Sequence, residues 1–426
     1  MSLPTPSTAL CTLREAHTAV RDTVATSHAV RQDDALARFE AADFPSLSHE
    51  DWRYTNLRPF KDAPLVPANQ STHAEETIGL AGWRLNVDPT RVVVPAGAPD
   101  GVTAISLREA IDSNHPLAAA LGTAHVDEDI ALRDLNDAFA ADALLINIAD
   151  NADIDTPILI DWQLAAGEHA LSSPRLLITA GRNSRATIIE RRVGRGGYSN
   201  AVSEVVVNDG ANLRYVDVSR ESAPSHLLAR LDALVARDAQ FDAFSLALGG
   251  TLTRNDLHVR LNAPGAGTSL CGSFVAGAGN HIDNHTVIDH VSERTTSNEN
   301  YRGIIGRAGH GVFNGKVIVR KDAQRINSAM NNDNLLLDDS AEIDTKPELQ
   351  IYADDVRCSH GATIGRLDEQ ALFYLRSRGL NTQTAKRLLL DAFAAEALVG
   401  VGGDLRDALV HSLTGFLSEQ LGEHRS

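Results

Sequence analysis

The feature that most constrains this chain is a stretch, from about Asp155 to Gly365, in which short β-rich runs follow one another without a long helix. Glycine, asparagine, aspartate and proline interrupt the runs, as in strands that are joined by tight turns. A faint repeat accompanies them: a polar residue or glycine, then alanine, then alternating apolar positions. Its alanines lie 25, 28, 27, 57 and 18 residues apart: Ala186, Ala211, Ala239, Ala266, Ala323 and Ala341.

Such spacings are typical of a solenoid with coils of roughly 20 to 30 residues, if the separation of 57 residues spans two coils. A single coil cannot bury its apolar face alone, so neighbouring coils must stack. We therefore predict a mainly β fold with a parallel β-helix at its centre. A large β-sandwich with irregular strand spacing is the alternative that the repeat leaves open.

Helical or mixed segments flank the β-rich region on both sides. Apolar residues recur every three or four positions from about Ser7 to Glu40, and a mixture of short helices and strands follows, RVVVPAG at 91–97 among them. After Gly365 the pattern predicts three helices, the first of which ends at Gly379. The expected domains are an N-terminal helical and mixed α/β region, the parallel β-helix and a C-terminal helical lobe, at 1–150, 151–365 and 366–426.

Charge and cysteine content exclude several classes of function. The chain has 56 acidic and 39 basic residues. Nucleic acids and anionic membranes reward clustered lysine and arginine, so we expect neither as a partner. Only Cys11, Cys271 and Cys358 are present, too few and too far apart for a disulfide framework, which favours a reducing compartment. They also exclude a self-contained site with four cysteine ligands, but not a site shared with histidine or with another chain.

No segment has the pattern of a membrane span or a secretory signal, so we expect a cytoplasmic protein. Nucleotide chemistry also lacks a signature. GHGVFNGKVIV resembles a phosphate-binding loop around Gly315 and Lys316, but His310 and Val317 replace the glycine and the serine or threonine that the loop requires. We interpret it as a hairpin turn before a strand. No GxSxG, HExxH or CxxC motif occurs, so no self-standing ATPase, hydrolase or oxidoreductase is indicated.

A histidine run in GNHIDNHTVIDH is the first candidate metal site. On a strand, His281 and His285 share one face with Asp283, and His290 points to the other face. Two imidazoles and a carboxylate are compatible with a metal ion. The alternative is that these histidines lie at coil edges and form hydrogen bonds with neighbouring loops.

The second candidate is IYADDVRCSHGATIG. Cys358 and His360 lie two residues apart on a predicted strand, so both side chains leave from the same face. Thiolate and imidazole are good ligands for iron, and mixed cysteine and histidine ligation of clusters is known. Gly361 permits a turn or a close backbone approach. The alternative is a buried, inert cysteine.

These residues belong to a longer stretch that resembles a known family. NNDNLLLDDSAEIDTKPELQIYADDVRCSHGATIGRLDEQALFYLRSRGL closely resembles the SufB/SufD family of iron–sulfur assembly proteins. The CSHGAT element with FYLRSRG behind it resembles the SufD branch, and so does EDWRYT at Glu50–Thr55. The resemblance is most specific over about 280–400 and weaker back to about 155.

The resemblance implies a right-handed parallel β-helix flanked by an N-terminal helical region and a C-terminal helical lobe. It implies a scaffold subunit rather than an enzyme. The subunit would pair with SufB, and each of the two would bind a copy of the ATPase SufC, which binds the ATP. The complex would build a nascent iron–sulfur cluster and pass it on, and ATP hydrolysis would rearrange the junction of SufB and SufD.

The resemblance also assigns residues. His360 matches the histidine implicated at the junction, where a transient cluster forms beside a cysteine of SufB, and Cys358 matches the neighbouring position with a less defined role. No tightly bound cofactor is expected on this chain alone. The predicted SufC-docking residues lie on the second helix of the C-terminal lobe: Leu388, Leu389, Phe393 and Ala397. A homodimer through the solenoid edge stays open.

Two other functions compete with this interpretation. One is a β-helix enzyme that acts on polysaccharides, although such proteins are usually secreted and no signal peptide is evident. The other is a stand-alone metal-binding solenoid that uses His281 and His285. Co-purification with an ATPase and a paralogous β-helix chain would favour the assembly role over both.

Overall fold

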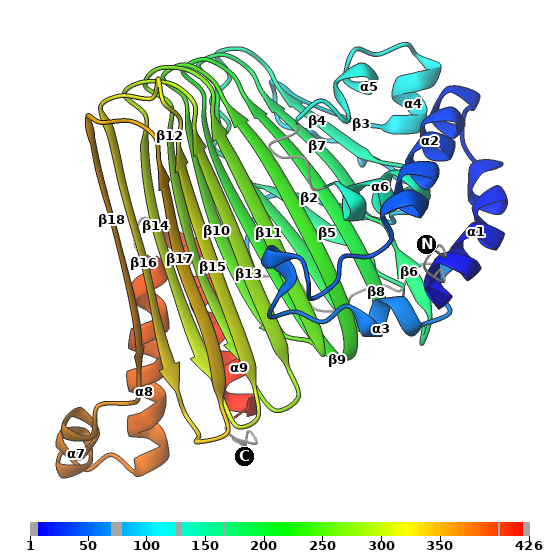
Figure 1. Ribbon diagram of the computed structural model, residues 1–426. Coiled ribbons are helices and arrows are strands. Elements are labelled where there is room, and N and C mark those ends of the chain that lie inside the picture. Colours follow the sequence, from blue (N-terminus) through cyan, green and yellow to red (C-terminus); the bar gives the residue numbers. More distant parts are fainter. Residues whose placement is uncertain (1–6, 70–78, 125–129, 166, 399–400, 421–426) are drawn as a thin grey trace.

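A computed structural model shows a long β-solenoid with helices at both ends of the chain (Figure 1). The structure describes residues 7–69, 79–124, 130–165, 167–398 and 401–420. The strands of successive coils pair in parallel register, so the predicted parallel β-helix core with helical flanks is confirmed and the sandwich alternative is wrong. None of the described helices is both long and apolar enough to cross a membrane.

The solenoid has two faces, because each later coil contributes one strand to each of them. The even-numbered strands from β10 to β18 pair with one another on one face, and the odd-numbered strands from β11 to β17 pair on the other. These strands are β10 (Gln240–Gly249), β11 (Leu252–Leu261), β12 (Gly267–Ala276), β13 (His281–His290), β14 (Thr296–Ile305), β15 (His310–Val319), β16 (Ile326–Leu336), β17 (Glu342–Ile351) and β18 (Val356–Gly365).

The first coils contain two longer strands, β8 (Arg185–Val207) and β9 (Asn212–Val235). The first half of β9 pairs with β10 and its second half with β11, so this strand follows both faces. Shorter strands precede them: β1 (Val66–Pro67), β2 (Trp83–Val87), β3 (Val102–Ser106), β4 (Leu144–Ile148), β5 (Ile158–Trp162), β6 (Ala170–Ser172) and β7 (Arg175–Ala180). The parallel strands of the solenoid thus include some that lie before residue 150, the predicted boundary between the N-terminal region and the β-helix. The division into domains stays a prediction.

The alanine repeat marks the corners of the coils. Four of its members lie at one corner of the solenoid: Ala211, Ala239, Ala266 and Ala323. Each donates its backbone N–H to the carbonyl oxygen three residues earlier, and each side chain is buried. Thr295 lies at this corner in the coil between Ala266 and Ala323, where its hydroxyl donates to the Ser292 carbonyl oxygen at 3.2 Å, and this accounts for the separation of 57 residues. Ala341 forms the same kind of turn at the opposite edge, before β17, which accounts for the separation of 18.

The N-terminal region covers the beginning of the solenoid with helices. Ser7 caps α1 (Thr8–Arg21) by accepting a hydrogen bond from the Leu10 N–H at 3.2 Å. The helical pattern predicted up to Glu40 is interrupted after Arg21, and α2 (Thr26–Ala42) follows. The RVVVPAG segment forms no strand, which corrects that expectation, since Arg91 makes only an isolated bridge. The remaining elements are η1 (Glu50–Trp52), α3 (Arg58–Asp62), α4 (Leu107–Asp112), α5 (Leu117–Ala120) and α6 (Ala131–Phe139).

The C-terminal lobe follows β18 and contains the three predicted helices, with a 3-10 turn after the second. They are α7 (Glu369–Ser377), α8 (Thr382–Ala395), η2 (Glu396–Leu398) and α9 (Gly403–Gln420). Gly379 ends the first of them with φ of 96°, a conformation that favours glycine. Apolar residues of α8 and α9, such as Leu390, Leu413 and Phe416, pack on the outer face of the even-numbered strands. α7 projects away from the solenoid (Figure 1).

Candidate functional site

Cys358 and His360 lie on β18, the last strand of the solenoid (Figure 1). β18 pairs with β16 along one edge, and no described strand pairs with its other edge. In this register Cys358 lies beside Ser328, and His360 lies beside Met330. The open end of the solenoid therefore carries both candidate ligands.

Inward-facing side chains of successive coils lie above one another in columns. Cys358 and His360 are the last members of two such columns. Ser328 and Met330, one coil earlier, are 2% and 3% exposed, but no further coil of the described structure covers Cys358 and His360. Cys358 is half-buried against the apolar core, and burial raises the pKa of its thiol. His360 is exposed at the rim of an open pocket that Glu299 also lines. The predicted placement on one strand face is thus observed, at a site that solvent or another chain can reach.

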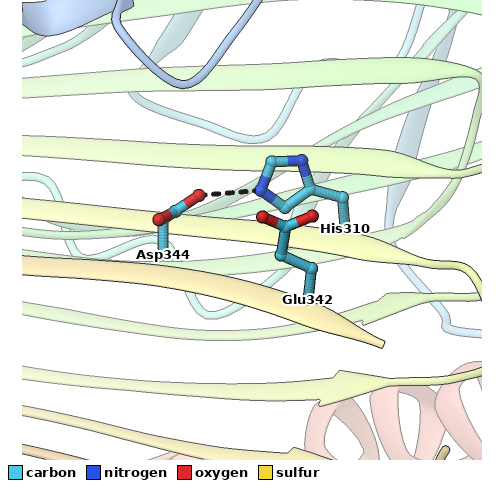
Figure 2. Close-up of side chains that lie close together, drawn as sticks. All are labelled: His310, Glu342 and Asp344. Atoms are coloured by element: carbon cyan, nitrogen blue, oxygen red, sulfur yellow. Dashed lines mark hydrogen bonds and ion pairs between the residues drawn. The ribbon is translucent and has the colours of Figure 1, made fainter. Parts of the chain in front are cut away.

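The ligand set at this end is incomplete on one chain. In the part of the chain that the structure describes, neither Cys358 nor His360 belongs to a group of three or more potential metal ligands. The group of this kind that it does contain is His310, Glu342 and Asp344, on the face of the odd-numbered strands (Figure 2). One thiol and one imidazole at an open edge hold a cluster only if further ligands come from elsewhere.

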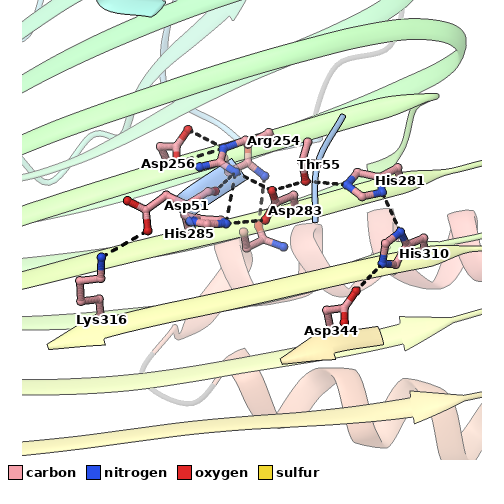
Figure 3. A network of polar contacts seen from close by, with 12 residues as sticks. Asp51, Thr55, Arg254, Asp256, His281, Asp283, His285, His310, Lys316 and Asp344 are labelled. Carbon is pink, nitrogen blue, oxygen red and sulfur yellow. Dashed lines mark hydrogen bonds and ion pairs between the residues drawn. The ribbon is translucent and has the colours of Figure 1, made fainter. Parts of the chain in front are cut away.

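The EDWRYT segment crosses the outer face of the odd-numbered strands (Figure 3). The guanidinium of Arg254 lies 3.7 Å from the centre of the Trp52 ring and donates a hydrogen bond of 2.8 Å to the backbone oxygen of Asp51. Lys316 Nζ lies 3.3 Å from Asp51 Oδ1, and Lys346 Nζ lies 2.6 Å from Glu50 Oε1. This motif therefore fastens the N-terminal region to the solenoid.

The segment GHGVFNGKVIV, which contains Lys316, is not the hairpin turn that the sequence predicted. All of the segment after its first glycine, from His310 to Val319, forms β15, and no hairpin turn lies around Gly315. A β-carbon at Gly315 would lie 2.7 Å from the sulfur of Met330, so packing inside the solenoid, rather than a turn, accounts for this glycine. Lys316 is held in an ion pair with the N-terminal segment and has no glycine-rich loop beside it.

The histidine run lies on β13 with the alternation that the sequence predicted. His290 points into the solenoid and contacts the hydroxyl oxygens of Thr295 and Ser297 at 2.7 and 2.9 Å. His285 Nε2 lies 3.1 Å from Asp283 Oδ1 on the outer face (Figure 3). Arg254 forms an ion pair of 2.7 Å with the same carboxylate, which holds the pKa of Asp283 well below its usual range together with His285. Asp283 thus serves an ion-pair network, and His281 turns toward other partners.

The predicted docking residues of the C-terminal lobe differ in exposure. Leu388 is 46% exposed, Leu389 is half-buried, and Ala397 is buried against the solenoid. Phe393 is half-buried, with the Arg302 guanidinium 4.8 Å from its ring centre. Their role in partner binding stays a prediction.

Two exposed aromatic residues on α7 were not among the predicted partner-binding residues. Phe373 is 72% exposed and Tyr374 is 56% exposed. A signal was present in FYLRSRG, because two adjacent aromatic residues on one helix point in different directions and do not both face the same core. Leu388 on α8 is also exposed, and we refer to these three exposed apolar residues of α7 and α8 as the α7–α8 surface.

Comparison with known proteins agrees with this geometry. A family model described as SUF system FeS cluster assembly, SufBD core domain, matches residues 162–393. The iron–sulfur cluster assembly protein SufD of Escherichia coli is 30% identical over 375 residues, which cover 83% of this chain and 84% of that protein. An iron–sulfur cluster assembly SufBD family protein of Synechocystis is 29% identical over 381 residues, 83% of each chain. Protein ABCI7, chloroplastic, of Arabidopsis thaliana is 26% identical over 395 residues, 86% of this chain and 81% of that protein. The chain therefore belongs to the SufBD family of the SUF system for iron–sulfur cluster assembly.

Proposed function

We propose that this protein is a non-catalytic scaffold subunit that builds a nascent iron–sulfur cluster together with a SufB-like paralogue and a SufC-like ATPase. The observation that carries the proposal is the position of His360, exposed on the last strand of the solenoid with Cys358 on the same face. The cluster is the cargo of this site. The three free cysteines Cys11, Cys271 and Cys358 suit a reducing compartment, and we propose the cytosol.

The open end explains why a second chain is needed. The outer edge of a terminal strand presents backbone N–H and C=O groups that another strand can pair with. A SufB-like solenoid docked on β18 would bring its own cysteine next to His360. It would also cover the inward-facing columns that end at Cys358.

The chemistry of the ligands suits temporary binding. A thiol binds iron as the thiolate, so binding at Cys358 must release the proton that burial favours. One imidazole and one such thiol from this chain hold the cluster less firmly than four buried thiolates do. Separating the two chains would remove part of the ligand set, and the cluster could then leave.

The ATPase would dock on the C-terminal lobe. The α7–α8 surface, formed by Phe373, Tyr374 and Leu388, gives it an apolar contact outside the solenoid core. Nucleotide binding on a separate chain is consistent with Lys316, whose segment is a regular strand of the solenoid. Hydrolysis on that partner would then drive the rearrangement at β18.

The test replaces the native protein in cells with the His360→Ala variant. We expect iron–sulfur enzyme activities to fall to the level of cells that lack the protein, whereas purified His360→Ala keeps the wild-type melting temperature because the side chain is exposed. Ser359→Ala, an exposed neighbour on the opposite strand face, is the matched control and should support normal activities. Wild-type activities with His360→Ala would contradict the proposal.

A further inference from the structure

Three potential metal ligands gather on the outer face of the odd-numbered strands, away from β18. His310 begins β15 and Glu342 begins β17, and the register places them side by side on neighbouring strands. Asp344 lies two residues beyond Glu342 on the same strand face, and its Oδ2 is 2.9 Å from His310 Nε2. The ligand atoms of these three residues all lie within 4.8 Å of one another (Figure 2).

A chain of polar contacts leads from this group into the protein (Figure 3). His310 Nδ1 lies 3.0 Å from His281 Nδ1, and His281 Nε2 lies 2.8 Å from the Thr55 hydroxyl. Thr55 in turn donates to Asp283, whose carboxylate Arg254 holds ionised. The contacts therefore run without a break from Asp283 to Asp344.

This row of polar contacts, from Asp283 to Asp344, has one proton fewer than it needs. The four contacts that join Asp283, Thr55, His281, His310 and Asp344 need one proton each, because two acceptors that face each other repel. The hydroxyl and the two neutral imidazoles supply three protons, and the carboxylates supply none. A cation bound at the outer end, between His310 and the carboxylates, would replace the missing proton.

Glu342 favours the cation at the outer end. Its carboxylate stands beside His310, is exposed, and forms no ion pair or hydrogen bond with any residue in the described ranges. A single proton on an imidazole would leave two carboxylates with one positive charge between them. A divalent ion would balance both carboxylates and would use the Nε2 lone pair of His310. His310 would then donate its Nδ1–H to His281, which is how a metal-bound histidine is usually oriented.

We propose that His310, Glu342 and Asp344 bind a divalent first-row transition-metal ion, with His281 as a positioning residue. One imidazole and two carboxylates are ligands that Fe²⁺, Mn²⁺ and Zn²⁺ accept, and the half-open setting leaves room for water ligands. The site lacks thiolate and lies on the face opposite to β18. It differs in this way from the cluster site proposed at Cys358 and His360, and it does not depend on that proposal.

The experiment titrates chelator-stripped, full-length protein with Co²⁺, whose visible absorption reports ligand geometry, and then displaces the Co²⁺ with Fe²⁺ without oxygen or with Zn²⁺. We expect one equivalent to bind to the wild-type protein. His310→Ala and the double variant Glu342→Gln/Asp344→Asn should each weaken binding at least tenfold. His281→Leu should weaken it by roughly 10- to 100-fold and shift the spectrum, and His281→Gln, which keeps an acceptor, should restore part of the affinity.

The matched control is Cys358→Ser/His360→Ala, which should bind Co²⁺ like the wild-type protein. Circular dichroism and melting temperature show which variants are folded. If His310→Ala is unfolded, the double variant carries the test, because its replacements keep the shape of both side chains. The proposal is overturned if folded wild-type protein binds no Co²⁺, or if binding survives in the His310 and carboxamide variants. Neither result would contradict the cluster proposal, because the His360→Ala experiment in cells tests that proposal separately.

Discussion

At the scale of single residues, Arg254 shows how the family motif near the N-terminus becomes part of the fold. Its side chain is 2% exposed, pairs with Asp256 at 2.8 Å and Asp283 at 2.7 Å, and lies under the ring of Trp52. A buried charge is tolerated when ion pairs and hydrogen bonds replace its hydration. Arg254 therefore joins two strands and the N-terminal segment in one network.

Replacing Arg254 with methionine keeps much of the side-chain volume but removes the guanidinium that pairs with the fully buried Asp283 and with Asp256, which is 13% exposed. We expect the free energy of unfolding to fall by about 3–5 kcal/mol, as is typical when one partner of a buried pair is removed. Urea unfolding followed by circular dichroism measures the change. The control is Arg366→Met, since Arg366 is 65% exposed and its partner Asp339 is 89% exposed, and it should cost at most about 1 kcal/mol. Equal losses in the two variants would contradict the role given to Arg254.

Glu299 makes the stability depend on pH in the direction opposite to most carboxylates. Its side chain is buried and accepts a hydrogen bond from Thr286 at 2.5 Å, and burial raises its pKa to about 8 from an ordinary value of 4.5. The folded state therefore holds this proton more tightly than the unfolded state does. Its contribution to stability is complete below pH 4.5 and is lost as the pH rises to about 8.

We therefore expect Glu299→Gln to remove part of the loss of stability between pH 5 and pH 8. The difference in slope between wild-type and variant protein should approach 1.4 kcal/mol per pH unit at most, the value for one proton. Urea unfolding at several pH values measures it. Glu293→Gln, on an exposed turn, should run parallel to the wild-type curve. A Glu299→Gln curve that also runs parallel would show that this carboxyl does not keep its proton.

Only one of the two proposed ligand groups could be predicted from the sequence, for a physical reason. Cys358 and His360 are two residues apart on one strand, so the alternation of side chains places them on the same face. His310 and Glu342 are separated by one whole coil, and they meet because of the register between β15 and β17. No local pattern contains that register, since it depends on the length of each corner.

At the scale of elements, a strand could be predicted where strands of the adjacent coils provide its backbone hydrogen-bond partners. The corner alanines indicated the spacing of the coils, because small buried side chains recur at this corner. RVVVPAG has three β-branched residues but no ladder partner among the residues that the structure describes, so its strand propensity is not realised there. GHGVFNGKVIV contains turn-forming residues, yet it pairs on both sides, with β13 and β17.

The α7–α8 surface supports a prediction about partner binding. Phe373 is 72% exposed, so Phe373→Ser should leave the melting temperature nearly unchanged. If this surface docks the ATPase, the variant should weaken binding to the SufC-like partner at least tenfold, because it removes an aromatic anchor. Surface plasmon resonance with the purified partner measures this. Val93→Ser, which changes another exposed apolar residue (65%), is the control, and an equal effect of both changes would contradict the docking site.

At the scale of the whole molecule, the two ends of the solenoid are treated differently. The N-terminal helices and the EDWRYT segment cover the beginning and one face, whereas β17 and β18 end the stack without a covering coil in the described structure (Figure 1). Open edges of this kind invite pairing with another chain. We therefore predict that the functional unit is an assembly, with the cluster site at the junction of two solenoids.

Affinity purification of the tagged protein from its native cells, followed by mass spectrometry of the recovered chains, tests this claim most directly. We expect a SufB-like β-solenoid paralogue and a SufC-like ATPase to be recovered with it in stoichiometric amounts. Recovery of the protein alone, or only as a homodimer, from cells that contain both partners would contradict the account.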